Sequence, residues 1–373
     1  MCVIAMKNRP NEIAAMKELQ SAGLLRPDIL PLVEIIHEKY EYDKLRDPIT
    51  GKYITEKRLC NDDKIRNYKI DDPSSKRDIT LQSICNLFPN RTVLVDYFRF
   101  EHSKYKFDPS KIELVLRLNR SVELYCQKVK AIKAYPLLVP VITVKRSMDD
   151  VLNANQVLSL VQEIRETDPN HHIAIRIDDI KGYEQVLQRV LHQDDYLIYD
   201  FNEQPFRSKP IECKDLADLG LTAHTVALCS PRKRDTTGKD YPNGEVATLI
   251  DNSHLDLYKH YGFSDVGDYG GLKDNLPSEG SYRGRALALM YMGTTNSFKS
   301  FVNTNAELGQ RGYPAVVARI LADNDFTDDS ECLVLKAITT KLQNGTGFSF
   351  AEWVKYTLIR YIQQLATKRP LFD

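Results

Sequence analysis

Apolar residues recur along the chain in short runs that alternate with segments of helical periodicity. Two of these runs, residues 172–178 and 196–200, are rich in β-branched or aromatic residues, and each ends in an aspartate. Between them, Val186, Leu187 and Val190 fall on one face of a helix. This pattern is typical of two parallel strands joined by a right-handed helical crossover.

The same unit recurs through most of the chain and gives eight predicted strands. They cover residues 1–7, 29–36, 91–96, 137–145, 172–178, 196–200, 225–230 and 246–251. Eight alternations followed by a helical tail predict an α/β fold, a TIM-like (β/α)8 barrel with a C-terminal α-helical extension. An open doubly wound sheet is the competing architecture, but no GxGxxG ligand fingerprint follows a predicted strand.

Two regions depart from the alternation. Within a barrel domain at 1–300, residues 38–77 are polar, charged and punctuated by proline and glycine, which predicts an insertion or long loop. Residues 301–373 form the predicted helical extension. Its strongest helix begins at Ser349, which has capping-box spacing with Glu352.

Composition limits the functional classes. The formal net charge is zero, so no global positive field draws the chain to nucleic acid or an acidic membrane, although a local basic patch is compatible with it. No apolar run approaches the roughly 20 residues that span a bilayer, and no signal-peptide pattern is present. Seven scattered cysteines without a CxxC pair predict reduced thiols and a cytoplasmic location.

Most predicted strands end in a charged side chain, and in a barrel these ends converge on one mouth, where catalytic groups are found. The candidate catalytic residues are Lys7, Glu34, Asp96, Lys145, Arg176, Asp178 and Asp200. Such a mixed ring can bind a divalent cation such as Mg²⁺ through carboxylates, or a phosphate between cations. The alternative is an ion-pair network that only neutralises buried charge.

Two loops supply candidate ligand-binding residues. Arg232 and Lys233 follow the seventh predicted strand and can contact phosphate groups, with a solvated turn as the alternative. The glycine-rich segment 262–271 follows the eighth predicted strand, and we expect it to cover the mouth as a lid. There it presents Asp265, Asp268 and Tyr269 to a ligand. No P-loop or GxSxG elbow occurs, which disfavours nucleoside-triphosphate hydrolysis and α/β-hydrolase chemistry.

Three segments, residues 7–19, 29–34 and 262–270, resemble the "beta family proteins" of phage and bacterial genomes. The resemblance runs from residue 1 to about residue 322. It implies phage–host conflict as the context and a nuclease-like protein as a partner, because some branches are similar to proteins encoded beside predicted nucleases in antiviral gene neighbourhoods. It assigns no reaction. The motif residues that it nominates are Lys7, Glu12, Glu34, Asp265, Asp268 and Tyr269.

Two hypotheses of function follow. In the first, the chain is a component of antiviral defence and a metal-assisted enzyme that acts at the barrel mouth on a phosphorylated ligand, a nucleotide or nucleic acid. In the second, it is a non-catalytic sensor or scaffold that binds a nuclease-like protein through its C-terminal helices. Aromatic residues within 353–365 then form the interface core, unless that helix packs against its own barrel.

Overall fold

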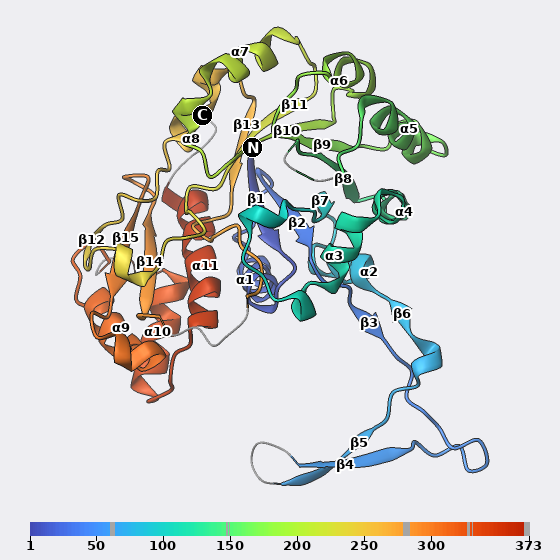
Figure 1. The fold of residues 1–373 in the computed structure, drawn as a ribbon. Coiled ribbons are helices and arrows are strands. Elements are labelled where there is room, and N and C mark those ends of the chain that lie inside the picture. Colours follow the sequence, from blue (N-terminus) through green and yellow to red (C-terminus); the bar gives the residue numbers. More distant parts are fainter. Residues whose placement is uncertain are drawn as a thin grey trace.

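A computed structural model describes residues 1–59, 64–146, 148, 150–278, 284–326, 329 and 331–368. In these residues eight parallel strands close into a barrel, which confirms the predicted TIM-like fold (Figure 1). The barrel strands are β1 (Cys2–Lys7), β2 (Ile29–Ile35), β7 (Val93–Tyr97), β8 (Leu138–Val144), β9 (Ala174–Ile177), β10 (Tyr196–Asn202), β11 (His224–Cys229) and β13 (Asp265–Asp268). Strands β1, β2 and β8 are buried at every position, because core side chains cover one face and helices the other.

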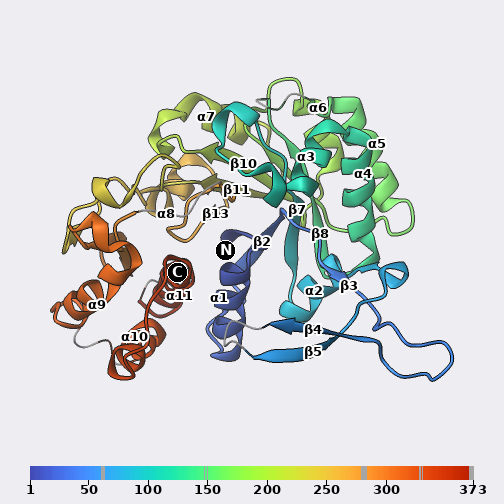
Figure 2. The same ribbon diagram turned by 60° about the horizontal axis from the view of Figure 1, so that its bottom comes forward.

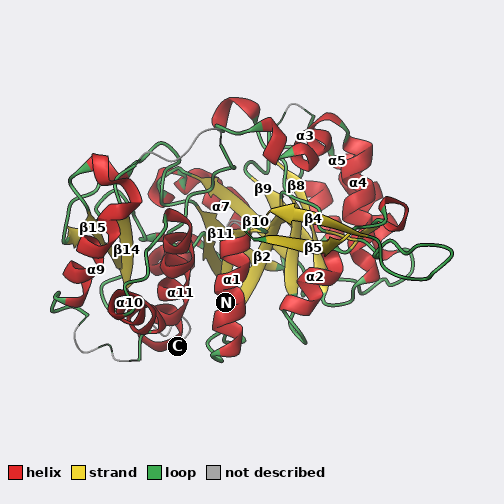
Figure 3. Cartoon of the chain, turned by 90° about the horizontal axis from the view of Figure 1, so that it is seen from below, coloured by secondary structure: helices red, strands yellow, loops and turns green. Residues whose placement is uncertain are grey.

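Helices follow the strands and cover the outside of the barrel (Figure 3). They are α1 (Pro10–Ser21), α2 (Thr80–Leu87), α3 (Glu113–Arg120), α4 (Val122–Ala131), α5 (Ala154–Arg165), α6 (Glu184–Val190), α7 (Pro210–Asp218) and the short α8 (His254–Leu257). Helix α5 shows how the local sequence determines these helices. Its apolar stripe, which includes Val157, Leu160 and Ile164, is buried, and a capping box between Asn153 and Gln156 fixes its start.

The prediction of an eighth barrel strand at residues 246–251 is wrong. Only Glu245–Val246 form a strand there, β12, which joins β15 (Ser297–Val302) and β14 (Leu287–Met292) in a separate antiparallel sheet. The barrel is closed instead by β13, which pairs with β1 and β11. A Cβ atom on Gly267 of β13 would lie 2.6 Å from the carbonyl oxygen of Val3, so this close approach of two strands excludes a side chain.

The C-terminal region packs against one side of the barrel. Three helices accompany the small sheet, α9 (Tyr313–Leu321), α10 (Leu333–Gln343) and α11 (Phe350–Lys368). Helix α11 lies beside α1 (Figure 2) and also contacts β14. The predicted capping box is confirmed, since the amide of Glu352 donates to Ser349 Oγ at 3.3 Å and the amide of Ser349 to Glu352 Oε2 at 3.0 Å. The aromatic face of α11 is buried within the chain, so these side chains are not an exposed interface core.

The predicted insertion at 38–77 forms an arm that projects from the barrel (Figure 1). Short strands β3 (Tyr40–Glu41) and β6 (Arg77–Asp78) make its stalk. Strands β4 (Thr55–Leu59) and β5 (Ile65–Lys69) make a hairpin at its end. The arm follows the C-terminal end of β2, so it leaves the barrel from the mouth end. Within the described residues, we find no helix with the length and apolar character needed to cross a membrane.

We expect Ile359→Ala in α11 to lower the free energy of unfolding by about 2–5 kcal/mol, because Ile359 is fully buried and its truncation leaves a cavity. Urea denaturation followed by circular dichroism measures the change. The matched control is Ile211→Ala, whose side chain is 71% exposed and whose loss should cost less than about 0.5 kcal/mol. Equal stabilities of the two variants would contradict the burial of α11.

Candidate functional site

The barrel mouth holds a buried network of ion pairs. Six of the seven candidate catalytic residues meet there, each 5% exposed or less: Lys7, Glu34, Asp96, Lys145, Arg176 and Asp200. They come from the C-terminal ends of neighbouring strands, which is why the sequence could place them together.

Arg176 lies at the centre of this network. Its Nη1 donates to Glu34 Oε1 at 2.7 Å and to Asp96 Oδ2 at 2.9 Å. Its Nε donates to Asp200 Oδ2 at 2.8 Å. Its Nη2 donates to the hydroxyl of Tyr269 at 2.9 Å. One planar guanidinium thus satisfies three carboxylates, a geometry that a lysine cannot reproduce.

Two lysines complete the pairing. Lys7 Nζ lies 2.5 Å from Glu34 Oε2 and 2.6 Å from Asp274 Oδ1. Lys145 Nζ lies 2.5 Å from Asp200 Oδ2.

Sequence reasoning missed Asp274 and did not predict that Arg234 would pair with it. Asp274 Oδ2 accepts from Arg234 Nη2 at 2.6 Å and from the hydroxyl of Tyr105 at 2.5 Å. All three side chains lie on loops beyond strand ends, where no periodicity signals their direction. With them, four carboxylates face four cations, so the mouth is electrically balanced.

The carboxyl groups of the mouth differ in acidity. Burial alone would raise the pKa of Glu34, but Lys7 and Arg176 outweigh it and hold that pKa below its usual value. Burial is likewise outweighed at Asp200, where Lys145 and Arg176 lower the pKa. At Asp96 burial prevails over Arg176, and the pKa is raised. Of these three carboxyl groups, Asp96 is therefore the one whose pKa lies above its ordinary value.

Two further predicted residues have different environments. Asp178 is half-buried, and its Oδ1 accepts from the backbone amide of Arg146 at 3.0 Å, so it lies apart from the ion-pair network. Tyr269 reaches the mouth as expected, because its hydroxyl donates to Glu34 Oε1 at 2.7 Å.

The prediction that segment 262–271 forms a lid is wrong, because Asp265–Asp268 runs along the barrel as strand β13. Asp265 begins that strand at the end opposite the mouth, where its Oδ1 pairs with the amino group of Met1 at 2.7 Å. Asp268 Oδ2 lies 2.8 Å from His254 Nε2 and accepts from the hydroxyl of Tyr361, so it ties β13 to α11. Neither aspartate is placed to bind a ligand at the mouth.

The mouth does not fit the Mg²⁺ ion that the sequence led us to consider. Its carboxylates already face ammonium or guanidinium groups, and a divalent cation would have to displace one of these. Across the part of the chain that the structure describes, no three His, Cys, Asp or Glu side chains gather in a way that could hold a metal ion.

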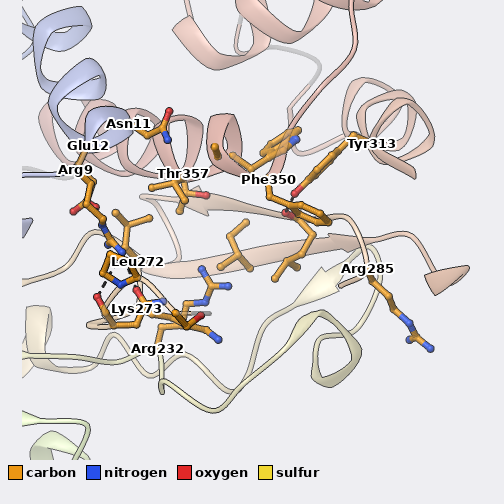
Figure 4. A pocket seen from close by; sticks show the side chains of 18 residues that line it. Arg9, Asn11, Glu12, Arg232, Leu272, Lys273, Arg285, Tyr313, Phe350 and Thr357 are labelled. Carbon is orange, nitrogen blue, oxygen red and sulfur yellow. Dashed lines mark hydrogen bonds and ion pairs between the residues drawn. The ribbon is translucent and has the colours of Figure 1, made fainter. Parts of the chain in front are cut away.

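A pocket of about 490 Å³ opens beside the mouth, between the barrel and the C-terminal region (Figure 4). Loops after β1, β11 and β13 form one side, and β14 with α11 forms the other. Arg9, Arg232 and Lys273 lie toward one end, and Tyr313 and Phe350 lie toward the other (Figure 4). The lining also includes Arg285 and Trp353.

The pocket is electropositive. Among the described residues that line it, the one carboxylate is that of Glu12, which pairs with Arg9 and accepts from the backbone amide of Lys7 at 2.7 Å. Burial, with Arg232 adding to it, lowers the pKa of Lys273 to about 8. Trp353 is 3% exposed, and its Nε1 has no hydrogen-bond partner among the described residues. Lys233, the other predicted residue of the β11 loop, is exposed.

Comparison with known proteins found no protein-family model and no curated protein sequence that matches this chain. The resemblance to beta family proteins therefore stays a prediction.

We expect Arg176→Met to lower the free energy of unfolding by about 3–5 kcal/mol at pH 8, because it leaves Glu34, Asp96 and Asp200 buried without their shared cation. In the folded variant the pKa values of these carboxyl groups rise, so folding takes up protons. The variant should then gain stability as the pH falls from 8 to 5. The wild type should gain less over this range, since among these three groups only Asp96 has a raised pKa, whereas the pKa values of Glu34 and Asp200 are lowered.

Urea denaturation at the two pH values measures this effect. Arg207→Met is the matched control, because Arg207 is exposed, and it should change the stability by less than about 0.5 kcal/mol. If Arg176→Met shows no pH-dependent change relative to this control, the network does not depend on Arg176.

Proposed function

We propose that this protein binds a phosphorylated small molecule, a nucleotide, in the pocket beside the barrel mouth. The observation that carries this proposal is an excess of positive charge around one cavity. Its described lining holds Arg9, Arg232, Lys273 and Arg285 against one carboxylate, Glu12, which pairs with Arg9. The pocket lies at the end of the barrel where TIM-barrel proteins bind their ligands.

The rest of the lining suits a nucleotide. The volume of about 490 Å³ falls within the range of about 300–1,000 Å³ that is usual for small-molecule sites. Phe350 is partly exposed and provides aromatic surface for a base, with the buried Trp353 packed beside it in the lining. Helix α1 begins at this pocket with Pro10 and Asn11, and the positive end of its dipole favours an anion.

The mouth network supports this pocket. Asp274 lies between two lining residues, Lys273 and Asn275, and it is held by Lys7 and Arg234. The loop that forms the pocket wall is therefore anchored by buried ion pairs, which fixes the cationic side chains before a ligand arrives.

This proposal keeps the phosphorylated ligand of the first hypothesis but moves it from the mouth to the pocket. The geometry favours binding over catalysis, since the carboxyl groups of the mouth are buried and Glu12 is engaged in an ion pair. A ligand sensor, as in the second hypothesis, is therefore the better supported role. The context that we propose, phage–host conflict with a nuclease-like partner, rests on the resemblance to beta family proteins alone.

We expect ATP to change the intrinsic fluorescence of the protein, because Trp353 is the single tryptophan of the chain and lines the pocket. Adenosine, which lacks phosphates, should bind at least about tenfold more weakly, as expected when charge-assisted bonds to phosphate are lost. The double variant Arg232→Ala/Lys273→Ala should weaken ATP binding by a similar factor.

Lys239→Ala is the control, because Lys239 is exposed and absent from the pocket lining. If millimolar ATP and inorganic phosphate change neither the fluorescence nor the melting temperature of the wild type, the pocket is not a phosphate site.

The affinity for ATP should also depend on pH. Lys273 binds an anion best when protonated, and its pKa in the free protein is lowered to about 8 by burial and Arg232. A bound phosphate favours the protonated amine and raises this pKa. The affinity should therefore fall as the pH rises above about 8, and Lys273→Met should remove that fall. A pH profile shared by wild type and Lys273→Met would contradict a role of Lys273.

A further inference from the structure

The arm formed by residues 38–77 ends in a hairpin that has no core of its own. Strands β4 and β5 pair at five positions, from Thr55 with Lys69 to Leu59 with Ile65. Leu59 is 70% exposed and Ile65 is 67% exposed, although both are apolar. A two-stranded hairpin is marginally stable on its own, so a hairpin that projects into solvent is built for contact with another molecule.

The hairpin concentrates positive charge in a chain whose net charge is zero. Its described residues 52–59 and 64–69 contain one acidic residue, Glu56, which pairs with Arg58. The basic residues in the same ranges are Lys52, Lys57, Arg58, Lys64, Arg66 and Lys69. Two further acids of the sequence, Asp62 and Asp63, lie outside the described residues.

One face of the hairpin carries basic, polar and apolar side chains but no acidic one in the described pairs. Residues directly opposite in an antiparallel ladder share a face, and every second pair lies on the same side. The pairs on this face are Thr55 with Lys69, Lys57 with Asn67, and Leu59 with Ile65. The amino group of Lys69 also lies 3.7 Å from the ring centre of Tyr53, which holds an aromatic side chain beside this face.

We propose that the arm binds double-stranded DNA by placing this hairpin in the major groove. A two-stranded β-ribbon fits that groove, which is about 12 Å wide. Lys57 and Lys69 then lie where they can contact phosphates, while Thr55 and Asn67 present a hydroxyl and an amide to the base edges. This proposed DNA-binding surface is separate from the proposed nucleotide pocket, whose described lining contains no residue of the arm.

The charge of the hairpin argues against a second copy of the chain as the occupant. Two identical arms would bring lysine against lysine, and lysines on exposed edge strands are a known protection against such pairing. DNA supplies the complementary charge, and the release of its counterions adds to the affinity.

The test is fluorescence anisotropy with a labelled DNA duplex of about 20 base pairs, between about 50 and 200 mM salt. Wild type should bind, with log Kd linear in log salt concentration. The variant Lys57→Glu/Lys69→Glu should bind at least about tenfold more weakly and reduce the salt slope by about two. The control variant Lys181→Glu/Lys239→Glu makes the same change of charge at exposed positions of the barrel loops and should keep the affinity within about threefold.

A deletion separates the arm from the rest of the protein. The amide of Asp72 donates to the carbonyl oxygen of Asp43 at 2.8 Å, so residues 44–71 can be replaced by a Gly-Ser-Gly linker at the top of the stalk. The shortened protein should keep its melting temperature and its fluorescence response to ATP but lose DNA binding. A loss of both the fluorescence response to ATP and DNA binding would indicate a folding defect. In that case the point variants at Lys57 and Lys69 test whether the arm binds DNA.

Three outcomes would overturn the proposal. The first is that wild type shows no duplex binding at low salt. Equal affinity for duplex DNA and duplex RNA would exclude groove insertion, because the deep, narrow major groove of RNA does not admit a ribbon. In a sedimentation experiment, the deletion could convert a dimer to a monomer. Together with no duplex binding by wild type, that result would show that the arm binds a second copy of the chain instead of DNA.

Discussion

The guanidinium group of Arg176 allows three carboxylates to be buried together at the barrel mouth. Removing an ion from water costs several kcal/mol, so Glu34, Asp96 and Asp200 can share this interior only with compensating cations. Lys7 extends the compensation to Asp274 and thereby fixes the loop after β13. The mouth is consequently a support for the surrounding loops, and the open, solvent-accessible pocket lies beside it.

The strand cores could be predicted because parallel strands covered on both faces leave uninterrupted apolar runs. Convergence of their ends also predicted that Lys7, Glu34 and Arg176 would meet. Strand β13 could not be predicted, since two of its four residues are aspartates and one is a glycine. It is a strand because it fills the gap between β1 and β11, which is a property of the closed barrel. The pairing of Asp274 with Arg234 could not be predicted for a similar reason, because the path of each loop determines where these side chains point.

The pocket and the arm have a common origin in the connections that leave the C-terminal ends of the barrel strands. Those after β1, β11 and β13 line the pocket, and the one after β2 carries the arm. Such connections can vary without disturbing the strands, which is how one barrel supports many kinds of site. A ligand in the pocket and a duplex on the arm would both lie at this end of the molecule, although they would contact different residues.

Closure of the barrel joins the first strand of the chain to a strand that begins at Asp265. At a synthesis rate of about 5–20 residues per second, β13 leaves the ribosome on the order of tens of seconds after β1. Throughout that interval one edge of β1, with the apolar residues from Cys2 to Met6, has no partner strand. Unpaired apolar edges promote aggregation. Nascent chains of this protein are therefore expected to depend on chaperones until the last barrel strand arrives.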